Sequence, residues 1–342
     1  MSSVDILRRS LPNMAKLAVG RTAPLFWLCK ITRRCNYKCR FCSVWRNAPC
    51  KELPTEGALR LVKEVADLGV VFVCIEGGEP LMRKDLGRVL KECKDYGIRT
   101  DIVTNGSLLP PRADEISRQC DCLTISLDGI GKDHDRLRGV PGAFARAVKA
   151  IDSVKGKTRV FVNSVITKTN YRNAGKIAEF ATDNGIFASF SPATYFEGAE
   201  DLRLSGQQFR EVMKRLQELK HAGMNVFVSD AFLSHCQRSE SLPCIAGKAY
   251  VSTDPLGRVT MPCCVINEPV YLEGGTVGQV FMGKEADRVR EVPACRECIL
   301  RCRDAIYSEA SVPLLDSFGQ VLDFCRMYDK AGALMEKARR GR

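Results

Sequence analysis

The chain has 342 residues, of which 45% are hydrophobic, so it can bury the core of one large α/β domain and of a smaller appendage. It contains no apolar run near the roughly 18 residues of a membrane-spanning helix and no signal-peptide pattern, so we expect a cytoplasmic protein whose 17 cysteines stay reduced. The net charge of +12 either favours an anionic partner or only solubilises the surface, and the lack of interleaved arginine and aromatic residues argues against nucleic acid.

The N-terminal segment, residues 4–20, is predicted to form a short basic amphipathic helix that Pro12 interrupts. Its apolar stripe and the cations beside it are Leu7, Leu11, Met14 and Ala18, with Arg8, Arg9, Lys16 and Arg21. Such a segment more often packs across the end of a barrel, and the alternative is that it lies on an anionic membrane surface. The second interpretation would make the protein peripheral at a membrane.

Three cysteines follow the apolar run 25–28 at the spacing C-x3-C-x2-C: Cys35, Cys39 and Cys42. Thiolates this close together in a reducing compartment indicate zinc or an iron–sulfur cluster rather than a disulfide. Three ligands favour the cluster, because a structural zinc needs four, whereas a three-thiolate [4Fe–4S] cluster leaves one iron open to a substrate or cofactor. A small zinc knuckle is the alternative.

Strands and helices alternate from residue 25 to residue 221. Strands are predicted at 25–31, 70–75, 98–103, 122–127, 158–166 and 186–190, and helices at 55–69, 84–96, 111–119, 142–154, 173–183 and 205–221. We expect Thr55 to cap the first of these helices and Gly69 to end it. Six βα units predict an α/β fold, a partial (β/α)6 barrel, with the active residues at the C-terminal ends of the strands.

The cysteine loop resembles the signature of the radical S-adenosylmethionine (SAM) superfamily, C-x3-C-x-φ-C, in which the aromatic φ is Phe41 here. The resemblance implies that Cys35, Cys39 and Cys42 bind a [4Fe–4S] cluster whose open iron chelates SAM, and that Phe41 packs near the adenine. It also implies an electron donor of the flavodoxin or ferredoxin type. One electron then cleaves SAM to a 5′-deoxyadenosyl radical.

A second motif follows the predicted strand 70–75. The run Gly77, Gly78, Glu79 and Pro80 resembles the GGEP motif of the superfamily, in which the backbone and the glutamate bind the amino group of SAM. Glycines at such a place let the backbone approach a ligand closely. An ordinary turn is the alternative for this motif taken alone, but its position one βα unit after the cysteine loop favours the resemblance.

Later strand ends, and the loop that contains Arg138, match further positions of the superfamily's SAM pocket. They are Asn105, Ser126, Asp128, Arg138 and Asn163. The resemblance implies that Ser126 and Asp128 meet the ribose or the carboxylate, that Asn105 shapes the floor, and that Arg138 either pairs with the carboxylate or orders its loop. Ordinary turn chemistry is the alternative for the Asn-Gly and Asp-Gly pairs among them.

The C-terminal part changes composition and is rich in cysteine. It resembles the SPASM/twitch extension of radical SAM enzymes, which opens with a Cys…D-x-x-G…P-C hairpin and carries auxiliary [4Fe–4S] clusters. One auxiliary cluster is expected, because the usual four-cysteine run is reduced to three, and zinc is the alternative. The simplest ligand set is Cys244, Cys263, Cys295 and Cys298, with Cys264, Cys302 and Cys325 as rivals.

These patterns predict three regions: an N-terminal segment 1–24, a radical SAM partial barrel 25–230 and a cluster domain 236–342. The resemblance implies an enzyme that abstracts hydrogen from an unactivated carbon. The basic N-terminal segment and the charge favour a lipid or isoprenoid at a membrane surface, slightly ahead of a ribosomally made peptide. A non-catalytic iron–sulfur scaffold is the alternative of another class, and the SAM-pocket motifs argue against it.

Overall fold

One curved sheet of nine strands, in the order β6-β5-β4-β3-β2-β1-β7-β8-β9, runs through the part of the chain that the structure describes. The computed structural model describes residues 3–47, 51–193, 200–228, 230–238, 246–261, 270–290 and 329–341. Strands β1 to β6 are parallel. They are β1 (Phe26–Thr32), β2 (Phe72–Gly77), β3 (Arg99–Thr104), β4 (Cys122–Ser126), β5 (Arg159–Ile166) and β6 (Phe187–Pro192).

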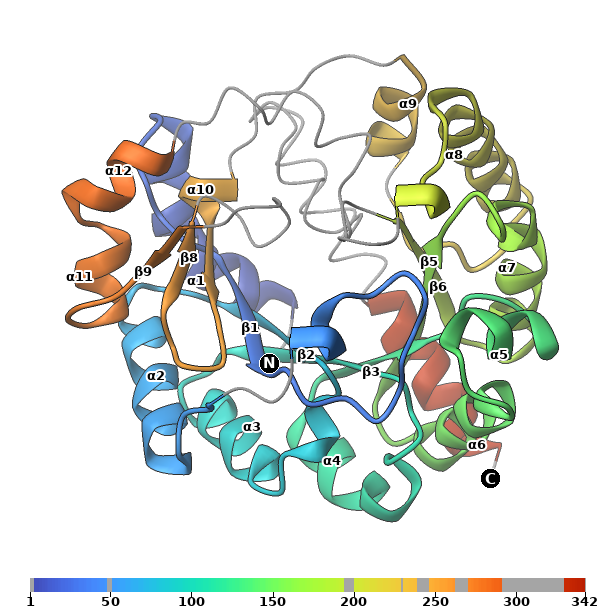
Figure 1. Cartoon of the computed structure of the whole chain (residues 1–342), viewed down its shortest axis with the longest axis horizontal. Helices are drawn as coiled ribbons and strands as arrows, with labels where there is room; N and C mark the ends of the chain where they lie inside the picture. The colour runs from blue at the N-terminus through green and yellow to red at the C-terminus, as the bar shows by residue number, and fades with distance from the viewer. Residues whose placement is uncertain are drawn as a thin grey trace.

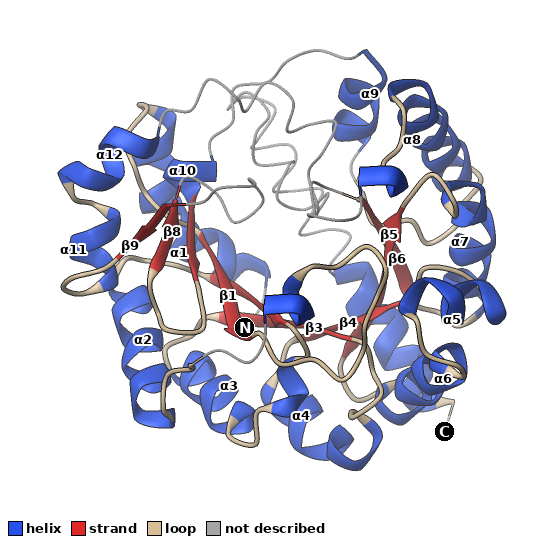
Figure 2. Ribbon diagram, in the orientation of Figure 1, coloured by secondary structure: helices blue, strands red, loops and turns tan. Residues whose placement is uncertain are grey.

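Helices cover the outer face of this sheet, as Figure 2 shows, and leave its concave face inside. The outer helices are α2 (Thr55–Asp67), α3 (Leu86–Asp95), α4 (Ala113–Gln119), α6 (Ala143–Val154), α7 (Ala174–Asp183) and α8 (Gly206–His221). Each of the six predicted strands and six predicted helices is present. The predicted partial (β/α)6 barrel is confirmed, and within the described residues the sheet stays open between β6 and β9.

The amphipathic pattern of the helices explains why they lie on the sheet. In α2 the buried side chains include Leu61, Val62 and Val65, which recur at helical spacing and join the main core. Thr55 is not the cap that the sequence predicts: it is the first helical residue, Pro54 occupies the cap position, and the Thr55 hydroxyl donates to Asp85 at 2.8 Å. Pro54 and its fixed φ thus start the helix, while the threonine ties it to the start of α3.

The N-terminal helix α1 (Ser3–Ala18) lies against the ends of two outer helices. The Asn13 amide donates to the carbonyls of Pro24 at 2.8 Å and Leu68 at 3.0 Å, and Arg9 donates to the carbonyl of Tyr96 at 2.9 Å. Leu68 and Tyr96 are the C-cap residues of α2 and α3, where backbone oxygens have no helical partner, and Pro24 lies just before β1. Packing across the barrel end, the first of the two expectations for this segment, is therefore what the structure shows.

The buried face of α1 differs from the predicted apolar stripe. Ser10 and Asn13 are its buried residues, whereas Leu11 is 49% exposed. Hydrogen bonding to helix ends, rather than apolar burial, therefore sets how α1 is turned. No helix in the described ranges is both long and apolar enough to cross a membrane.

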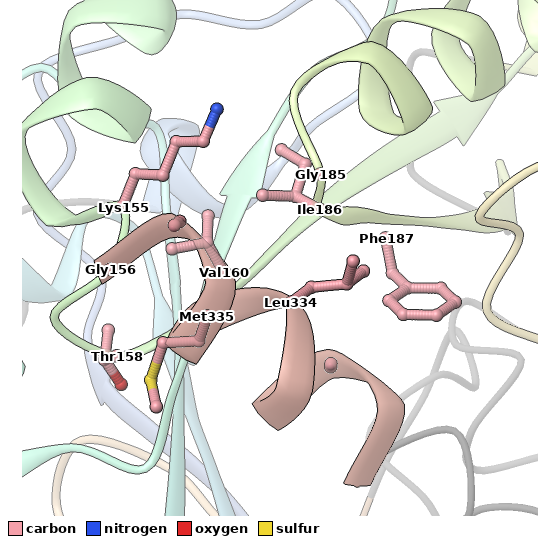
Figure 3. A pocket seen from close by; sticks show the side chains of 11 residues that line it. Lys155, Gly156, Thr158, Val160, Gly185, Ile186, Phe187, Leu334 and Met335 are labelled. Carbon is pink, nitrogen blue, oxygen red and sulfur yellow. The ribbon is translucent and has the colours of Figure 1, made fainter. Parts of the chain in front are cut away.

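A C-terminal helix, residues 329–340, packs under the starts of β5 and β6, near the C label in Figure 1. Figure 3 shows Leu334 and Met335 of this helix beside Val160 and Phe187, around a small hollow of about 260 Å³. The Lys330 ammonium lies 5.6 Å from the centre of the Phe187 ring. Both described ends of the chain thus cover parts of the barrel remote from the C-terminal strand ends.

The first strands of the C-terminal region extend the barrel sheet. Strand β7 (Tyr250–Thr253) pairs in parallel with β1, and a tight turn leads into the antiparallel strands β8 (Val259–Met261) and β9 (Val270–Leu272). Asp254 shapes the turn by accepting from the backbone of Leu256 and Arg258, both at 3.0 Å, and Gly257 has a φ of +77°. The expected D-x-x-G hairpin is confirmed. The seven candidate auxiliary ligands, Cys244 to Cys325, all lie outside the described residues.

The remaining described helices are α5 (Lys132–Arg138), α9 (Asp230–Arg238), α10 (Ala246–Ala249), α11 (Val277–Phe281) and α12 (Lys284–Arg290). Only α5 contributes to the candidate site. The sequence predicts a loop there, because seven residues are too few to show a periodic pattern. Gly139, with a φ of +68°, ends this helix.

Replacing Asn13 by alanine should destabilise the fold, because the carbonyls of Pro24 and Leu68 lose their donor. We expect a decrease of about 1–3 kcal/mol in the free energy of unfolding, measured by denaturant titration. Arg8→Ala, on the exposed face of the same helix, is the matched control and should change it little. Equal stabilities for the wild type and Asn13→Ala would show that α1 does not hold the barrel end.

Candidate radical SAM active site

The cysteine loop leaves the C-terminal end of β1 and crosses toward α5; it is the blue loop in front of the sheet in Figure 1. The backbone N–H of Arg40 donates to the carbonyl of Leu137 in α5 at 3.1 Å. Cys39 is buried, whereas Cys35 and Cys42 are half-buried, and all three line one pocket. The structure thus brings the three predicted ligands together at the strand ends where the barrel prediction puts the active residues.

Two glycines at the end of β2 let the loop lie directly on the sheet. The N–H of Gly78 donates to the carbonyl of Thr32 at 2.8 Å, and the N–H of Glu79 donates to that of Arg34 at 2.7 Å. A Cβ on Gly77 would lie 2.2 Å from the Thr32 oxygen, and one on Gly78 would lie 2.1 Å from the Arg34 oxygen. No side chain fits there, so the glycines bring β2 against the cysteine loop while they also line the pocket.

The carboxylate of Glu79 lies behind the pocket wall rather than among the residues that line it. It accepts from the Thr104 hydroxyl at 2.7 Å and from the N–H groups of Asn105 at 2.8 Å and Leu81 at 3.1 Å. Burial raises the pKa of Glu79, and these three hydrogen bonds oppose the rise. The side chain therefore joins the ends of β2 and β3, and Pro80 continues the chain as the start of a short 3-10 turn, Pro80–Met82.

A buried ion pair connects the end of β4 to the cysteine loop. Arg138 Nε lies 2.6 Å from Asp128 Oδ2, and the other Asp128 oxygen accepts from the N–H of Val165 at 2.8 Å. The guanidinium also lies 5.3 Å from the centre of the Phe41 ring and donates to the Cys39 sulfur at 3.8 Å. Asp128 is fully buried and does not line the pocket, whereas Arg138 and Phe41 do. Asp128 is therefore placed to orient Arg138.

Three more predicted positions line the pocket: Asn105, Ser126 and Asn163. The Asn105 amide donates to Asn36 at 2.8 Å, and Asn163 accepts from the hydroxyls of Ser189 and Ser191 at 3.1 and 3.0 Å. These bonds fix which atoms of the two amides face the pocket. The space between the lining residues, including the part that opens to solvent, is about 840 Å³.

Seven lining residues were not among the predicted site residues: Tyr37, Trp45, Glu76, Val103, Thr104, Val165 and Pro192. Tyr37 and Trp45 belong to the cysteine loop, and the Trp45 indole donates to the carbonyl of Cys39 at 3.2 Å. Tyr37 lies between two of the cysteines and Trp45 follows the third, and this position in the sequence could have indicated that both line the pocket. Glu76 directly precedes Gly77, so the sequence could also have predicted that Glu76 lies at the end of a strand.

The donor set fits an iron–sulfur cluster better than one zinc ion. Burial raises the pKa of the Cys35 thiol to about 12 and that of Cys39 to about 11, so their thiolates need a compensating metal cation. The pocket is lined by three cysteines, one fewer than the four ligands that a structural zinc ion takes. A [4Fe–4S] cluster held by three thiolates would keep one iron for a further ligand.

Comparison with known proteins agrees with this geometry. Residues 29–183 match the family model described as the radical SAM superfamily. Residues 29–183 therefore form a radical SAM domain. Its family uses a [4Fe–4S] cluster and SAM, which are the cofactors that the three-cysteine loop and the open pocket fit.

Two curated relatives cover most of the chain. An AdoMet-dependent heme synthase of Methanosarcina barkeri is 27% identical over 70% of this chain and 77% of its own length. A PqqA peptide cyclase of Methylocella silvestris is 27% identical over 70% of this chain and 68% of its own length. The chain thus has relatives that are named for two different activities, heme synthesis and peptide cyclisation.

Solved structures share the fold. Streptococcus suis SuiB bound to S-adenosylmethionine superposes with a TM-score of 0.65 at 20% identity, over 90% of this chain and 76% of that one. The protein anSMEcpe, with bound AdoMet and a Cp18Cys peptide, has a TM-score of 0.61 at 16% identity, over 90% of this chain and 99% of that one. At these identities the similarity shows only that this chain has the same fold.

Replacing Cys39 by alanine should remove one cluster and abolish SAM cleavage. We expect a loss of about four irons per chain after anaerobic reconstitution, measured by iron analysis, and no 5′-deoxyadenosine by chromatography. The matched control is Cys93→Ala, which removes a thiol buried in the core on α3. It should retain the wild-type iron content and the formation of 5′-deoxyadenosine. SAM cleavage by Cys39→Ala at the wild-type rate would refute the ligand assignment.

The buried His134 should make stability depend on pH. Its Nδ1 accepts from the N–H of Asp128 at 2.9 Å, and burial lowers its pKa from 6.5 to about 4. Between pH 6.5 and pH 4 His134 takes up a proton in the unfolded chain but not in the folded one. The free energy of unfolding therefore decreases as the pH falls from 6.5 to 4. The loss is about 3 kcal/mol at most, at 1.36 kcal/mol per unit.

Denaturant titrations between pH 7 and pH 4 measure this loss. His134→Gln should show a shallower decline than the wild type, because the group that titrates is gone. His221→Gln, at an exposed position on α8, should follow the wild type. Identical slopes for all three proteins would show that His134 takes up its proton equally in both states.

Proposed function

We propose that the chain is a maturase that uses radical SAM chemistry on a ribosomally made peptide, forming a crosslink or removing hydrogen. The similarity to a PqqA peptide cyclase over 70% of the chain carries this proposal. The fold shared with SuiB and anSMEcpe, both also solved with peptides, supports it. Bound SAM and a reduced cluster would supply the 5′-deoxyadenosyl radical that abstracts a hydrogen atom from the substrate.

The residues of the pocket have distinct roles in this proposal. Cys35, Cys39 and Cys42 hold the cluster, and the backbone of Gly77 and Gly78 faces the SAM amino group. The remaining polar and charged lining residues bind the other polar groups of SAM: Asn105, Ser126, Arg138 and Asn163. The aromatic rings of Phe41, Tyr37 and Trp45 exclude water from the reacting atoms.

Two buried carboxylates act through other groups. Glu79 holds the ends of β2 and β3 together, and Asp128 keeps the Arg138 guanidinium against Phe41 and Cys39. Removing either carboxylate leaves buried donors without a partner, which costs roughly 1–3 kcal/mol for each such donor. Both are positioning residues.

The C-terminal region adds an auxiliary cluster in this proposal. Relatives with SPASM-type extensions and the Asp254 hairpin support it. The ligand set that we propose is Cys244, Cys263, Cys295 and Cys298. The lipid or isoprenoid substrate and the membrane association expected from the sequence gain no support from the relatives, and α1 uses its polar face to hold the barrel end.

A tetrapyrrole substrate is the second candidate. The AdoMet-dependent heme synthase of Methanosarcina barkeri aligns with as much of this chain as the peptide cyclase does. The carboxylates of such a substrate would also suit a chain with a net charge of +12. A further relative, from Methanosarcina barkeri, is named Fe-coproporphyrin III synthase, so iron coproporphyrin is the tetrapyrrole that we would test. Incubation with iron coproporphyrin and SAM distinguishes the two candidates, because tetrapyrrole turnover changes the visible absorbance spectrum.

The peptide proposal predicts a mass change in a cellular peptide. Reconstituted enzyme, SAM and reductant should convert one component of a peptide extract to a product lighter by two hydrogen atoms, detected by mass spectrometry. Enzyme with Cys39→Ala should leave the extract unchanged. A change in the iron coproporphyrin spectrum, with every peptide mass preserved, would replace the peptide by the tetrapyrrole.

A further inference from the structure

Glu52, which follows the cysteine loop in the chain, forms an ion pair with the residue just before the first cysteine. Its carboxylate accepts two hydrogen bonds from the Arg34 guanidinium, from Nε to Oε1 and from Nη2 to Oε2, both at 2.9 Å. It also accepts from the hydroxyl of Thr32, the last residue of β1. Arg34 directly precedes Cys35, so this ion pair lies beside one of the three predicted cluster ligands.

Arg34 is held by its backbone as well as by its side chain. Its carbonyl accepts from the N–H of Glu79 at 2.7 Å, and its own N–H donates to the Thr32 hydroxyl at 3.0 Å. A carboxylate that takes two parallel bonds from a guanidinium also fixes the direction of the arginine side chain. The contacts with Glu79, Thr32 and Glu52 together determine the conformation of the residue from which Cys35 follows.

Glu52 has a firm support of its own. Arg83 Nη1 lies 3.9 Å from Glu52 Oε2 and donates to the carbonyl of Leu53 at 3.1 Å. The Arg83 side chain is only 5% exposed and forms two bonds with Asp85, at 3.0 and 2.7 Å. Partial burial on its own would raise the pKa of Glu52, but the hydrogen bonds from Arg34 and Thr32 lower it below its usual value. Glu52 is therefore an ionised group in a fixed network.

The residue next to Glu52 contacts the C-terminal region. The N–H of Leu53 donates to the carbonyl of Pro255 at 2.8 Å, in the turn between β7 and β8. A Cβ on Gly257 of the same turn would lie 2.9 Å from Leu53 Cδ1, so the turn packs closely on this side chain. Residues 52–53 thus connect the start of the cysteine loop to the Asp254 hairpin.

We propose that Glu52 is a positioning residue for the cluster, which acts through Arg34 and determines where Cys35 lies relative to the glycines of the pocket. Glu52 is not among the described residues that line the pocket, so it does not meet SAM itself. Displacement of Cys35 would move the cluster relative to the backbone of Gly77 and Gly78, and SAM must contact both at once. The inference rests on the radical SAM assignment of the three cysteines and is independent of the substrate.

The test measures SAM binding by the reconstituted full-length protein. SAM is titrated, and the change in the electron paramagnetic resonance signal of the reduced cluster gives the half-saturating concentration. Glu52→Gln removes the charge but keeps the size of the side chain, and it should need about tenfold more SAM. The matched control, Glu56→Gln, removes a carboxylate from an exposed ion pair with Arg88 at 3.0 Å and should bind SAM like the wild type.

A double variant separates this role from a merely structural one. Arg34→Gln should weaken SAM binding about as much as Glu52→Gln does. The double variant should be no weaker than either single variant, because the two side chains act as one unit. If the two effects multiply instead, Glu52 acts independently of Arg34 and the proposal is wrong.

Hydrogen exchange gives a readout that needs no SAM. The backbone amide of Glu79 donates to the Arg34 carbonyl, so it should exchange faster in Glu52→Gln than in Glu56→Gln. Should Glu52→Gln retain no cluster, Arg34→Lys is titrated in its place. Lysine keeps the charge but not the two-bond geometry, so a smaller loss of SAM affinity is expected.

The failure of this proposal is distinct from a failure of the radical SAM assignment. Wild-type SAM affinity and wild-type exchange at Glu79 in Glu52→Gln would show that the ion pair does not position the loop. A wild-type protein whose signal does not respond to SAM would instead refute the assignment of the three cysteines.

Discussion

The candidate site depends on the direct contact between the backbone of the cysteine loop and the end of β2. Two hydrogen bonds, from Gly78 to Thr32 and from Glu79 to Arg34, extend the pairing of β1 and β2 beyond the sheet. A Cβ at either glycine would overlap the opposite carbonyl. The sequence Gly-Gly is thus a steric requirement, and it fixes where the first cysteine leaves the strand.

Two buried carboxylates then extend this constraint across the sheet. Glu79 accepts hydrogen bonds from the end of β3, and Asp128 pairs with Arg138 while it accepts from Val165 at the β5 end. A buried charge is costly unless it is paired and hydrogen-bonded, so each carboxylate determines the conformation of the groups around it. The result is a pocket whose wall is fixed before any ligand binds.

The sequence predicted most of the barrel because its signals are local. Apolar strand runs and amphipathic helices define all six βα units, and the cysteine spacing placed Cys35, Cys39 and Cys42 on one loop. Pairings between segments that lie far apart in the sequence could not be predicted from these local signals. The addition of β7 to β1 is one such pairing, since Tyr250 and Phe26 are 224 positions apart. The inward direction of Glu79 is another, because it depends on Thr104 and Asn105, which belong to the next strand.

We propose that the pocket of Cys35, Cys39 and Cys42 holds a cluster with one iron open to SAM. Electron paramagnetic resonance of the reduced, reconstituted protein tests it most directly, because a ligand on iron alters the spectrum. Addition of SAM should change the signal of the wild type and leave that of Cys39→Ala unchanged. If the wild type binds iron but its spectrum does not respond to SAM, the cluster in this pocket has no iron open to SAM.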